Sequence, residues 1–160
     1  MVVQGSPGFQ IGVISDTHGL IRPEALAALR GVDQIVHAGD VGSPDVLTAL
    51  TRVAPVTAIR GNNDTGEWAR RLAGTATVVA AGVRLYVLHN VHELGLDPKT
   101  KGFGGVIAGH SHRPALEERD GVLFVNPGSA GPRRFKLPVA VARLHVADGR
   151  VRGELTLLDV

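Results

Sequence analysis

Short apolar runs rich in β-branched residues recur along the chain, and a small or polar residue ends each of them. In the first 60 residues of the chain they occupy residues 11–14, 34–38 and 56–59. Runs of this length and composition are typical of buried strands. The pattern therefore predicts a series of strands, each followed directly by a polar segment.

Amphipathic segments separate these first strands. One covers residues 23–30, where Leu26 and Leu29 share a face. Another begins after Ser43, the expected N-cap residue, with Pro44 in its first turn. Because strands alternate with helices here, the first part of the chain predicts a parallel α/β sheet.

The second half of the chain consists mostly of predicted strands. Residues 75–80 and 83–88 flank Ala81-Gly82, which is the pattern of a β-hairpin. Asp120-Gly121 and Asp148-Gly149 mark two further hairpin turns. The other expected strands are around residue 116 and at residues 105–108, 122–125, 139–146 and 151–158.

No repeat, low-complexity tract or linker interrupts this pattern, so we predict a single domain over residues 1–160. Residues 1–9 precede the first strand and are expected to form a flexible N-terminal tail. Residues 90–104 are expected to form a surface loop with at most a short helix.

Composition narrows the picture. Hydrophobic residues make up 44% of the chain but aromatic residues only 4%, so the core is expected to consist of Val, Leu, Ala and Ile. The net charge is +2, and the longest basic cluster is Arg133-Arg134 with Lys136. A broad nucleic-acid-binding face is therefore not expected. That cluster is expected to be either a contact for an anionic substrate or a solvated turn.

The sequence has no cysteine, which excludes disulfides and thiolate metal sites. The first ten residues lack the features of a signal peptide, and no apolar run approaches the roughly 18 residues that cross a membrane. We therefore expect a cytoplasmic enzyme or binding domain. Apolar edge strands near the C-terminus could pair between subunits, which leaves a homo-oligomer possible.

Polar residues of one chemical type follow five of the predicted strands. In chain order they are Asp16 and His18, Asp40, Asn62, His89, and His110 with His112. Parallel strands of one sheet end at the same edge, so these side chains can converge. Asp16 and His18 alone would more often belong to an ordinary turn, and it is the full set that predicts a site.

Seven nitrogen and oxygen ligands exceed the four to six that one ion takes, but they suffice for two ions roughly 3.5–4 Å apart that share a carboxylate. Asp40, isolated at a strand end, is the natural bridge. Mixed His, Asp and Asn ligands suit Mn²⁺, Fe²⁺, Co²⁺, Ni²⁺ or Zn²⁺ better than Mg²⁺ or Ca²⁺. Two such ions can convert a bridging water into hydroxide near neutral pH and neutralise charge on a phosphate.

The ordered motifs Asp-x-His, Gly-Asp, Gly-Asn-x-Asp, a strand-ending His and Gly-His-Ser-His resemble those of the calcineurin-like metallophosphoesterases. The short length and Asn126-Pro127-Gly128-Ser129 are most similar to small phosphodiesterases of the YfcE/MJ0936 type and to the related Vps29 fold. The resemblance implies an α/β sandwich of two mixed sheets flanked by helices, with two metal ions, Mn²⁺ foremost, at their shared edge.

The resemblance also implies a role for each position. One ion would be held by Asp16, His18, Asp40 and His112, and the other by Asp40, Asn62, His89 and His110. Asp64 would orient a ligand, and residues 126–129 would form a tight turn near the site. Contacts of Ser129 or Arg133 with substrate are left open.

Two positions depart from the family pattern. Many larger relatives carry histidine after the Gly-Asn pair, where it can protonate the leaving oxygen, whereas this chain has Asn63. Asn63 can still bond a phosphate oxygen, but alkyl monoesters should be poor substrates because general acid catalysis is worth about 10²–10⁴-fold. The strand-ending His89 is followed by Asn90-Val91-His92 rather than Gly-His, and we expect His89 to be the ligand.

The expected function is therefore a two-metal phosphoesterase that acts on a small phosphodiester or another phosphorylated molecule. The alternative is a Vps29-like interaction module without catalysis, and a nuclease is less favoured because aromatic residues for base stacking are few. His37 is expected to be packed in the core, His145 to be structural or exposed, and Trp68 to pack with Leu72 as part of a helix.

Overall fold

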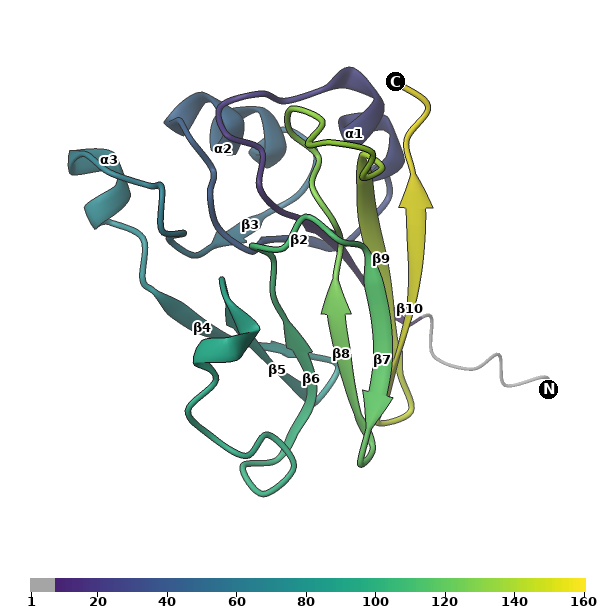
Figure 1. The fold of residues 1–160 in the computed structure, drawn as a ribbon. Coiled ribbons are helices and arrows are strands. Elements are labelled where there is room, and N and C mark those ends of the chain that lie inside the picture. The colour runs from purple at the N-terminus through teal and green to yellow at the C-terminus, as the bar shows by residue number, and fades with distance from the viewer. Residues whose placement is uncertain (1–7) are drawn as a thin grey trace, which may run out of the picture.

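The structure is a computed structural model that describes residues 8–160. It contains two five-stranded sheets packed face to face, so the predicted α/β sandwich of two mixed sheets is confirmed (Figure 1). The predicted tail over residues 1–9 lies mostly outside the described residues, and its last member, Phe9, already belongs to the first strand.

The first sheet has the strand order β10-β9-β1-β2-β3. Strands β1, β2 and β3 run parallel, as the alternating pattern predicts, and β9 and β10 add an antiparallel hairpin beside β1. Their bounds are Phe9–Ile14 for β1, Gln34–His37 for β2, Val56–Ala58 for β3, Ala140–Ala147 for β9 and Arg150–Leu157 for β10.

The second sheet has the order β4-β5-β6-β8-β7. Strands β5, β6 and β8 run parallel, and the antiparallel strands β4 and β7 form the two edges. Their bounds are Thr75–Ala80 for β4, Val83–Leu88 for β5, Phe103–Ile107 for β6, Ala115–Arg119 for β7 and Val122–Asn126 for β8.

Alternate residues of the facing strands fill the space between the sheets. Ile11 and Val13 of β1 meet Leu85 and Val87 of β5, and each of these side chains is fully buried. Because successive strand residues point to opposite faces, the residues between them point away from this core. The core consists of aliphatic side chains, as the composition predicts.

The helices α1 (Pro23–Ala28) and α2 (Pro44–Thr51) cover the outer face of the first sheet (Figure 1). Ser43 occupies the N-cap position of α2, but its side chain makes no capping hydrogen bond within the described residues. Trp68 of α3 (Glu67–Arg70) and Leu72 pack against the same cluster, but Leu72 lies beyond the end of the helix that was expected to contain both.

The loop over residues 90–104 contains only the 3₁₀ turn η1 (Val91–Glu93) before β6 begins at Phe103. The predicted hairpin turns Ala81-Gly82, Asp120-Gly121 and Asp148-Gly149 all have positive φ at both residues. That backbone matches the twist of the strands that the turns join. No helix among the described residues is long and apolar enough to cross a membrane.

The five strands that precede the candidate ligands belong to two sheets rather than to one. Strands β1, β2 and β3 belong to the first sheet, whereas β5 and β6 belong to the second. The seven predicted ligands therefore do not follow the parallel strands of a single sheet, contrary to the prediction. The ligands come from the parallel strands of two facing sheets.

Candidate metal centre

The loops that follow β1 and β2 run side by side and are joined by backbone hydrogen bonds. Asp16 N donates to Gly39 O at 3.0 Å, and His18 N donates to Asp40 O at 3.0 Å. The Thr17 hydroxyl adds a bond to the carbonyl of Val41 at 2.7 Å. These contacts hold the carboxylates of the two loops next to each other.

The backbone at the site has an uncommon conformation. The φ angle is positive at Asp16, His18, Asp40, His110 and His112, with values between 47° and 72°. Side chains other than glycine rarely adopt this region, and such residues concentrate at functional sites. The other non-glycine residues with positive φ among residues 8–160 lie in the hairpin turns or at Phe135. Five of the seven predicted ligands therefore share a conformation that the rest of the fold uses mainly for turns.

Asp16 lies at the centre of the site and is fully buried. Its Oδ2 accepts hydrogen bonds from the Ser15 hydroxyl at 2.7 Å and from His110 N at 3.0 Å. Its Oδ1 has no hydrogen-bond partner within residues 8–160. A buried carboxylate oxygen without a partner is costly, and a bound cation would remove that cost.

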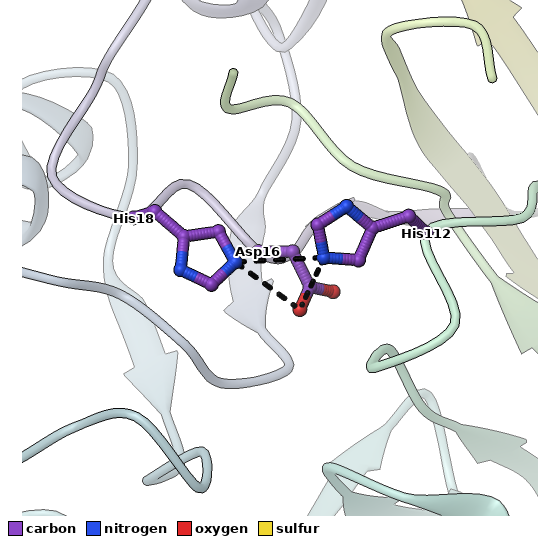
Figure 2. Close-up of side chains that lie close together, drawn as sticks. All are labelled: Asp16, His18 and His112. Atoms are coloured by element: carbon purple, nitrogen blue, oxygen red, sulfur yellow. Dashed lines mark hydrogen bonds and ion pairs between the residues drawn. The ribbon is translucent and has the colours of Figure 1, made fainter. Parts of the chain in front are cut away.

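Three imidazole nitrogens surround this unpaired oxygen. The Nε2 atoms of His112, His89 and His18 lie 3.4, 3.8 and 3.9 Å from Asp16 Oδ1. Figure 2 shows Asp16, His18 and His112 pointing toward one another, and the Nε2 atoms of the two histidines are 3.5 Å apart. One carboxylate oxygen and several imidazole nitrogens aimed at the same point are a donor set for a transition metal.

Asp40 forms the other side of the site. Its Oδ2 lies 3.2 Å from His89 Nε2 and 3.9 Å from His18 Nε2. Asn63 fixes this carboxylate, because its backbone N–H donates to Oδ1 at 2.9 Å and its side-chain amide donates to Oδ2 at 3.1 Å. Asp40 is almost completely buried, with 2% of its surface exposed.

A backbone carbonyl directly after β2 of the first sheet fixes the orientation of the His89 ring. Its Nδ1 lies 2.7 Å from the carbonyl of Ala38, which can only accept a hydrogen bond, so Nδ1 carries a proton. In the neutral ring, Nε2 is then left with a lone pair directed at the two carboxylates. This is the arrangement that commonly orients a metal-binding histidine.

The carboxylates of Asp16 and Asp40 together favour a positive charge between them. Burial lowers the pKa of His89, but the hydrogen bonds with Asp40 and Ala38 and the charge of Asp16 outweigh burial and raise it above its ordinary value. Burial raises the pKa of the Asp40 carboxyl, but the bonds from His89 and Asn63 bring it well below the usual range. The same field that attracts a proton to His89 would attract a divalent cation.

The structure brings five of the predicted ligands into two overlapping groups. Asp16 lies with His18 and His112 in one group and with Asp40 and His89 in the other. Asp16 belongs to both groups here, whereas Asp40 is the bridge that the sequence suggests. Both carboxylates lie near histidines of both predicted ion sites, so either can contact two ions.

The remaining predicted ligands, Asn62 and His110, are exposed and lie at the mouth of the site. Together with His89 they line a cleft of about 480 Å³. The ring of His110 is 5.2 Å from that of His89, centre to centre, in an edge-to-face arrangement. These two side chains therefore lie between the buried carboxylates and solvent.

Asp64 connects the loops beneath the site. The side chain is 5% exposed, and its carboxylate accepts hydrogen bonds from the backbone N–H groups of Val41, Gly42 and Gly61 at 2.9–3.1 Å. It therefore holds the loops that carry Asp40 and Asn62 in place without facing the cleft. The role of Asp64 fits a positioning residue.

Glycines allow these loops to approach closely. A Cβ atom added at Gly61 would collide with the backbone and carboxylate of Asp40. One added at Gly109 would lie 2.6 Å from Asp16 Oδ2 and would also collide with the Ser15 hydroxyl. Glycine is needed at both positions because the neighbouring chain occupies the space of a side chain.

In the Asn126–Ser129 segment the Asn126 side chain accepts a hydrogen bond from Gly128 N at 2.9 Å, and Ser129 does not line the cleft. Its side chain is buried, and its hydroxyl donates to the carbonyl of Asp16 at 3.0 Å. Arg133 is exposed and donates to the carbonyl of Val160 at 3.1 Å. Arg133 and Arg134 also border a hollow of about 270 Å³ beside His18 and His112.

Sequence reasoning missed the hydroxyl groups that support the ligands. Ser15 bonds the carboxylate of Asp16, Thr17 bonds Val41, and Ser129 bonds the backbone of Asp16. Their position directly after a buried strand, or inside the Asn-Pro-Gly-Ser turn, was the available signal. The pattern could not reveal their partners, because each partner comes from a distant loop or from the residue beside it.

His37 is fully buried, as expected, and forms a hydrogen-bonded chain behind the site. Its Nδ1 accepts from Gly39 N at 3.1 Å, so the proton of the neutral ring is on Nε2, which lies 3.0 Å from the Thr17 hydroxyl. Burial lowers the pKa of His37 to about 4, against the opposing charges of Asp16, Asp64 and Asp40. The ring is therefore neutral at neutral pH.

This buried ring predicts acid destabilisation. Above pH 6.5 the ring is neutral in both the folded and the unfolded chain, but between pH 6.5 and 4 only the unfolded chain takes up the proton. The free energy of unfolding should fall by about 3 kcal/mol across this window. Urea unfolding of metal-stripped protein between pH 4.5 and 7.5 measures this loss.

His37→Gln should flatten the pH dependence, whereas His145→Gln should preserve it. His145 is a suitable control because it lies on the outer face of β9 and bonds Glu154 at 3.1 Å. An unchanged slope in His37→Gln would contradict the assignment.

Comparisons with known proteins agree with this geometry. The sequence model of the calcineurin-like phosphoesterase superfamily domain matches residues 9–149. A protein of Methanothermobacter thermautotrophicus described as "Probable metallophosphoesterase" is 35% identical over 150 residues, which cover 84% of this chain and 85% of the relative.

Solved structures have the same fold. An archaeal phosphodiesterase superposes with a TM-score of 0.76 at 25% identity and covers 92% of this chain and 100% of its own. Vps29 of Cryptosporidium parvum superposes with a TM-score of 0.75 and covers 97% of this chain and 100% of its own. Because the two sequences are only 15% identical, this likeness concerns the fold alone. Since the matched segment contains nine of the ten strands and every candidate ligand, the chain belongs to the calcineurin-like phosphoesterase superfamily.

Proposed function

We propose that this protein is a phosphodiesterase that uses two divalent metal ions. The observation that carries the proposal is the buried, unpaired Oδ1 of Asp16, which faces three imidazole nitrogens beside a second carboxylate. An unpaired buried carboxylate oxygen costs free energy, and such groups concentrate at functional sites.

The chain supplies ligands for both ions. Asp16, His18 and His112 would hold one ion, and Asp40 and His89, with Asn62 and His110 at the cleft, would hold the other. When bound, such ions supply a nucleophile from water at neutral pH and neutralise negative charge on phosphate oxygens. Mn²⁺ is the first ion to test, and Zn²⁺, Ni²⁺, Fe²⁺ and Co²⁺ suit the same ligands.

The residues around the ligands orient them and admit the substrate. Asn63 holds both oxygens of Asp40, and Asp64 holds the loops on either side. The cleft lined by Asn62, His89 and His110 is open to solvent and large enough for a phosphate with its ester groups. The similarity to an archaeal phosphodiesterase supports a diester as the substrate.

Elemental analysis of the purified, Mn²⁺-loaded protein tests the proposal together with an activity assay on bis-aryl phosphodiesters. We expect about two transition-metal ions per chain and metal-dependent hydrolysis. A folded protein that binds no metal after loading, and that hydrolyses no diester, would favour the non-catalytic, Vps29-like alternative.

Asn63 predicts a strong dependence on the leaving group. Its amide is bound to Asp40 and cannot donate a proton by titration, so departing oxygens receive no help from this position. Across a series of aryl phosphodiesters, the rate should fall steeply as the pKa of the leaving phenol rises. Asn63→His should make this dependence shallower and should raise the rate for the poorest leaving groups by about 10–100-fold.

Asn63→Ala is the matched control for this series, because it also loses the amide but adds no acid. It should keep the steep dependence at a lower overall rate. An equally steep series in Asn63→His would mean that position 63 does not reach the leaving oxygen.

A further inference from the structure

An apolar cavity lies on the outer face of the second sheet, beside the metal centre. Its volume is about 280 Å³. Val106, Ala108 and Phe124 of the β6–β8 region line it together with Val91 of η1 and Ala115 of β7. We call this cavity the apolar pocket. On the first sheet the corresponding outer face is covered by α1 and α2, whereas here, among residues 8–160, only the short η1 segment and its neighbours pack on the apolar cluster.

The apolar pocket adjoins the cleft of the metal centre. Asn90 and His110 line both hollows. Asn90 is held in place because its side chain caps η1 by accepting from His92 N at 3.1 Å. A phosphate bound beside His110 would therefore have one ester group at the entrance of the apolar pocket.

Three of the polar side chains around the apolar pocket, those of Glu117, Arg119 and Asn126, are already paired. Glu117 binds Arg119 at 2.9 Å, and the Arg119 guanidinium lies over the Phe124 ring, 4.7 Å from its centre. The Asn126 side-chain amide donates to Gly109 O and to the Ser111 hydroxyl, both at 3.0 Å. What the pocket offers to a ligand is consequently its apolar floor and the Phe124 ring, with the positive charge of Arg113 at its rim.

We propose that the apolar pocket binds a flat aromatic ring that is esterified to the phosphate at the metal centre. This inference rests on the proposed function and names the substrate class for the same site. A cavity of this volume accommodates a ring, and the apolar floor gains from burying one. The Phe124 ring adds a preferred contact for an aromatic rather than an aliphatic group.

Chemical-shift changes of the protein's own methyl groups test the pocket without turnover. Zn²⁺-loaded protein with labelled valine methyl groups is titrated with phenylphosphonate, methylphosphonate and thymidine 5′-monophosphate. Phenylphosphonate should shift the Val91 and Val106 methyl resonances, and methylphosphonate should not. In the thymidine compound the ring is joined to the phosphate through the sugar, so a larger shift with it than with phenylphosphonate would overturn the assignment of a directly esterified ring, and a smaller one would support it.

Two diesters with the same leaving group test the pocket in catalysis. Phenyl and methyl p-nitrophenyl phosphate differ only in the group that stays, so the ratio of their kcat/KM values measures how that group is bound. The phenyl ester should be favoured about 10–50-fold. Ala115→Phe, which fills the pocket from the exposed edge strand β7, should lower that ratio about tenfold.

Val79→Phe is the matched control, because Val79 is 63% exposed on β4, the opposite edge of the same sheet. It should leave the ratio unchanged. Turnover of both diesters at equal kcat/KM, without shifts at Val91 and Val106, would overturn the pocket assignment and leave the proposed function standing. Phenylphosphonate shifts in a protein that hydrolyses neither diester would overturn the proposed function and support the pocket.

Discussion

Asp40→Asn should reduce metal-dependent phosphodiester hydrolysis by at least about 10³-fold. The substitution keeps the shape of the side chain but removes the negative charge that lies 3.2 Å from His89 Nε2. It also places an amide donor where the carboxylate now accepts two bonds from Asn63. Steady-state rates on a bis-aryl diester and the metal content per chain measure the two consequences.

Asp159→Asn is the control for this loss, since it makes the same exchange at an exposed position near the C-terminus. Its rate and metal content should match those of the unmodified protein. If Asp40→Asn retained both metal ions and full activity, Asp40 would not be a ligand and the proposed centre would need another bridge. Circular dichroism of both variants separates this effect from a loss of fold.

Asp64→Ala should lower the free energy of unfolding by about 3 kcal/mol, because three backbone N–H groups lose their common buried acceptor. It should also weaken metal binding by about 10–100-fold, since the loops that carry Asp40 and Asn62 lose their shared anchor. Urea unfolding in the presence of a chelator measures the first effect, and metal competition measures the second.

Asp97→Ala provides the comparison for Asp64→Ala. Asp97 also accepts from a backbone N–H, that of Lys99, and from the Thr100 hydroxyl, but its loop is exposed. Its removal should leave the free energy of unfolding nearly unchanged, because water replaces the lost bonds. Weakened stability with unchanged metal affinity in Asp64→Ala would show that Asp64 supports the fold without positioning the ligands.

The fold was predictable where local patterns determine it. The alternation of strands and helices up to residue 59 fixed the parallel arrangement of β1, β2 and β3, and the paired positive-φ turns marked three hairpins. The assignment of β5 and β6 to a second sheet had no local signal. Their residues are apolar in either sheet, and only the packing of one sheet on the other separates the two arrangements.

The candidate site was predictable as a set of residues but not as a geometry. Chemical type and position at strand ends identified the ligands, whereas the central place of Asp16 depends on hydrogen bonds from Ser15 and His110 to one of its oxygens. The burial of Ser129 likewise depends on its bond to the Asp16 carbonyl. The bonds from His110 and Ser129 join residues 94 and 113 positions apart, beyond the reach of any local pattern.

The division of the ligands between two sheets has a consequence for synthesis of the chain. Asp16, His18 and Asp40 emerge early from the ribosome, but His89 and His112 follow much later, and β1 must still wait for β9 as its antiparallel neighbour. The early segment therefore exposes its carboxylates and one histidine before their partners exist. We expect metal binding to occur late in the synthesis and folding of this protein, after translation has passed residue 112.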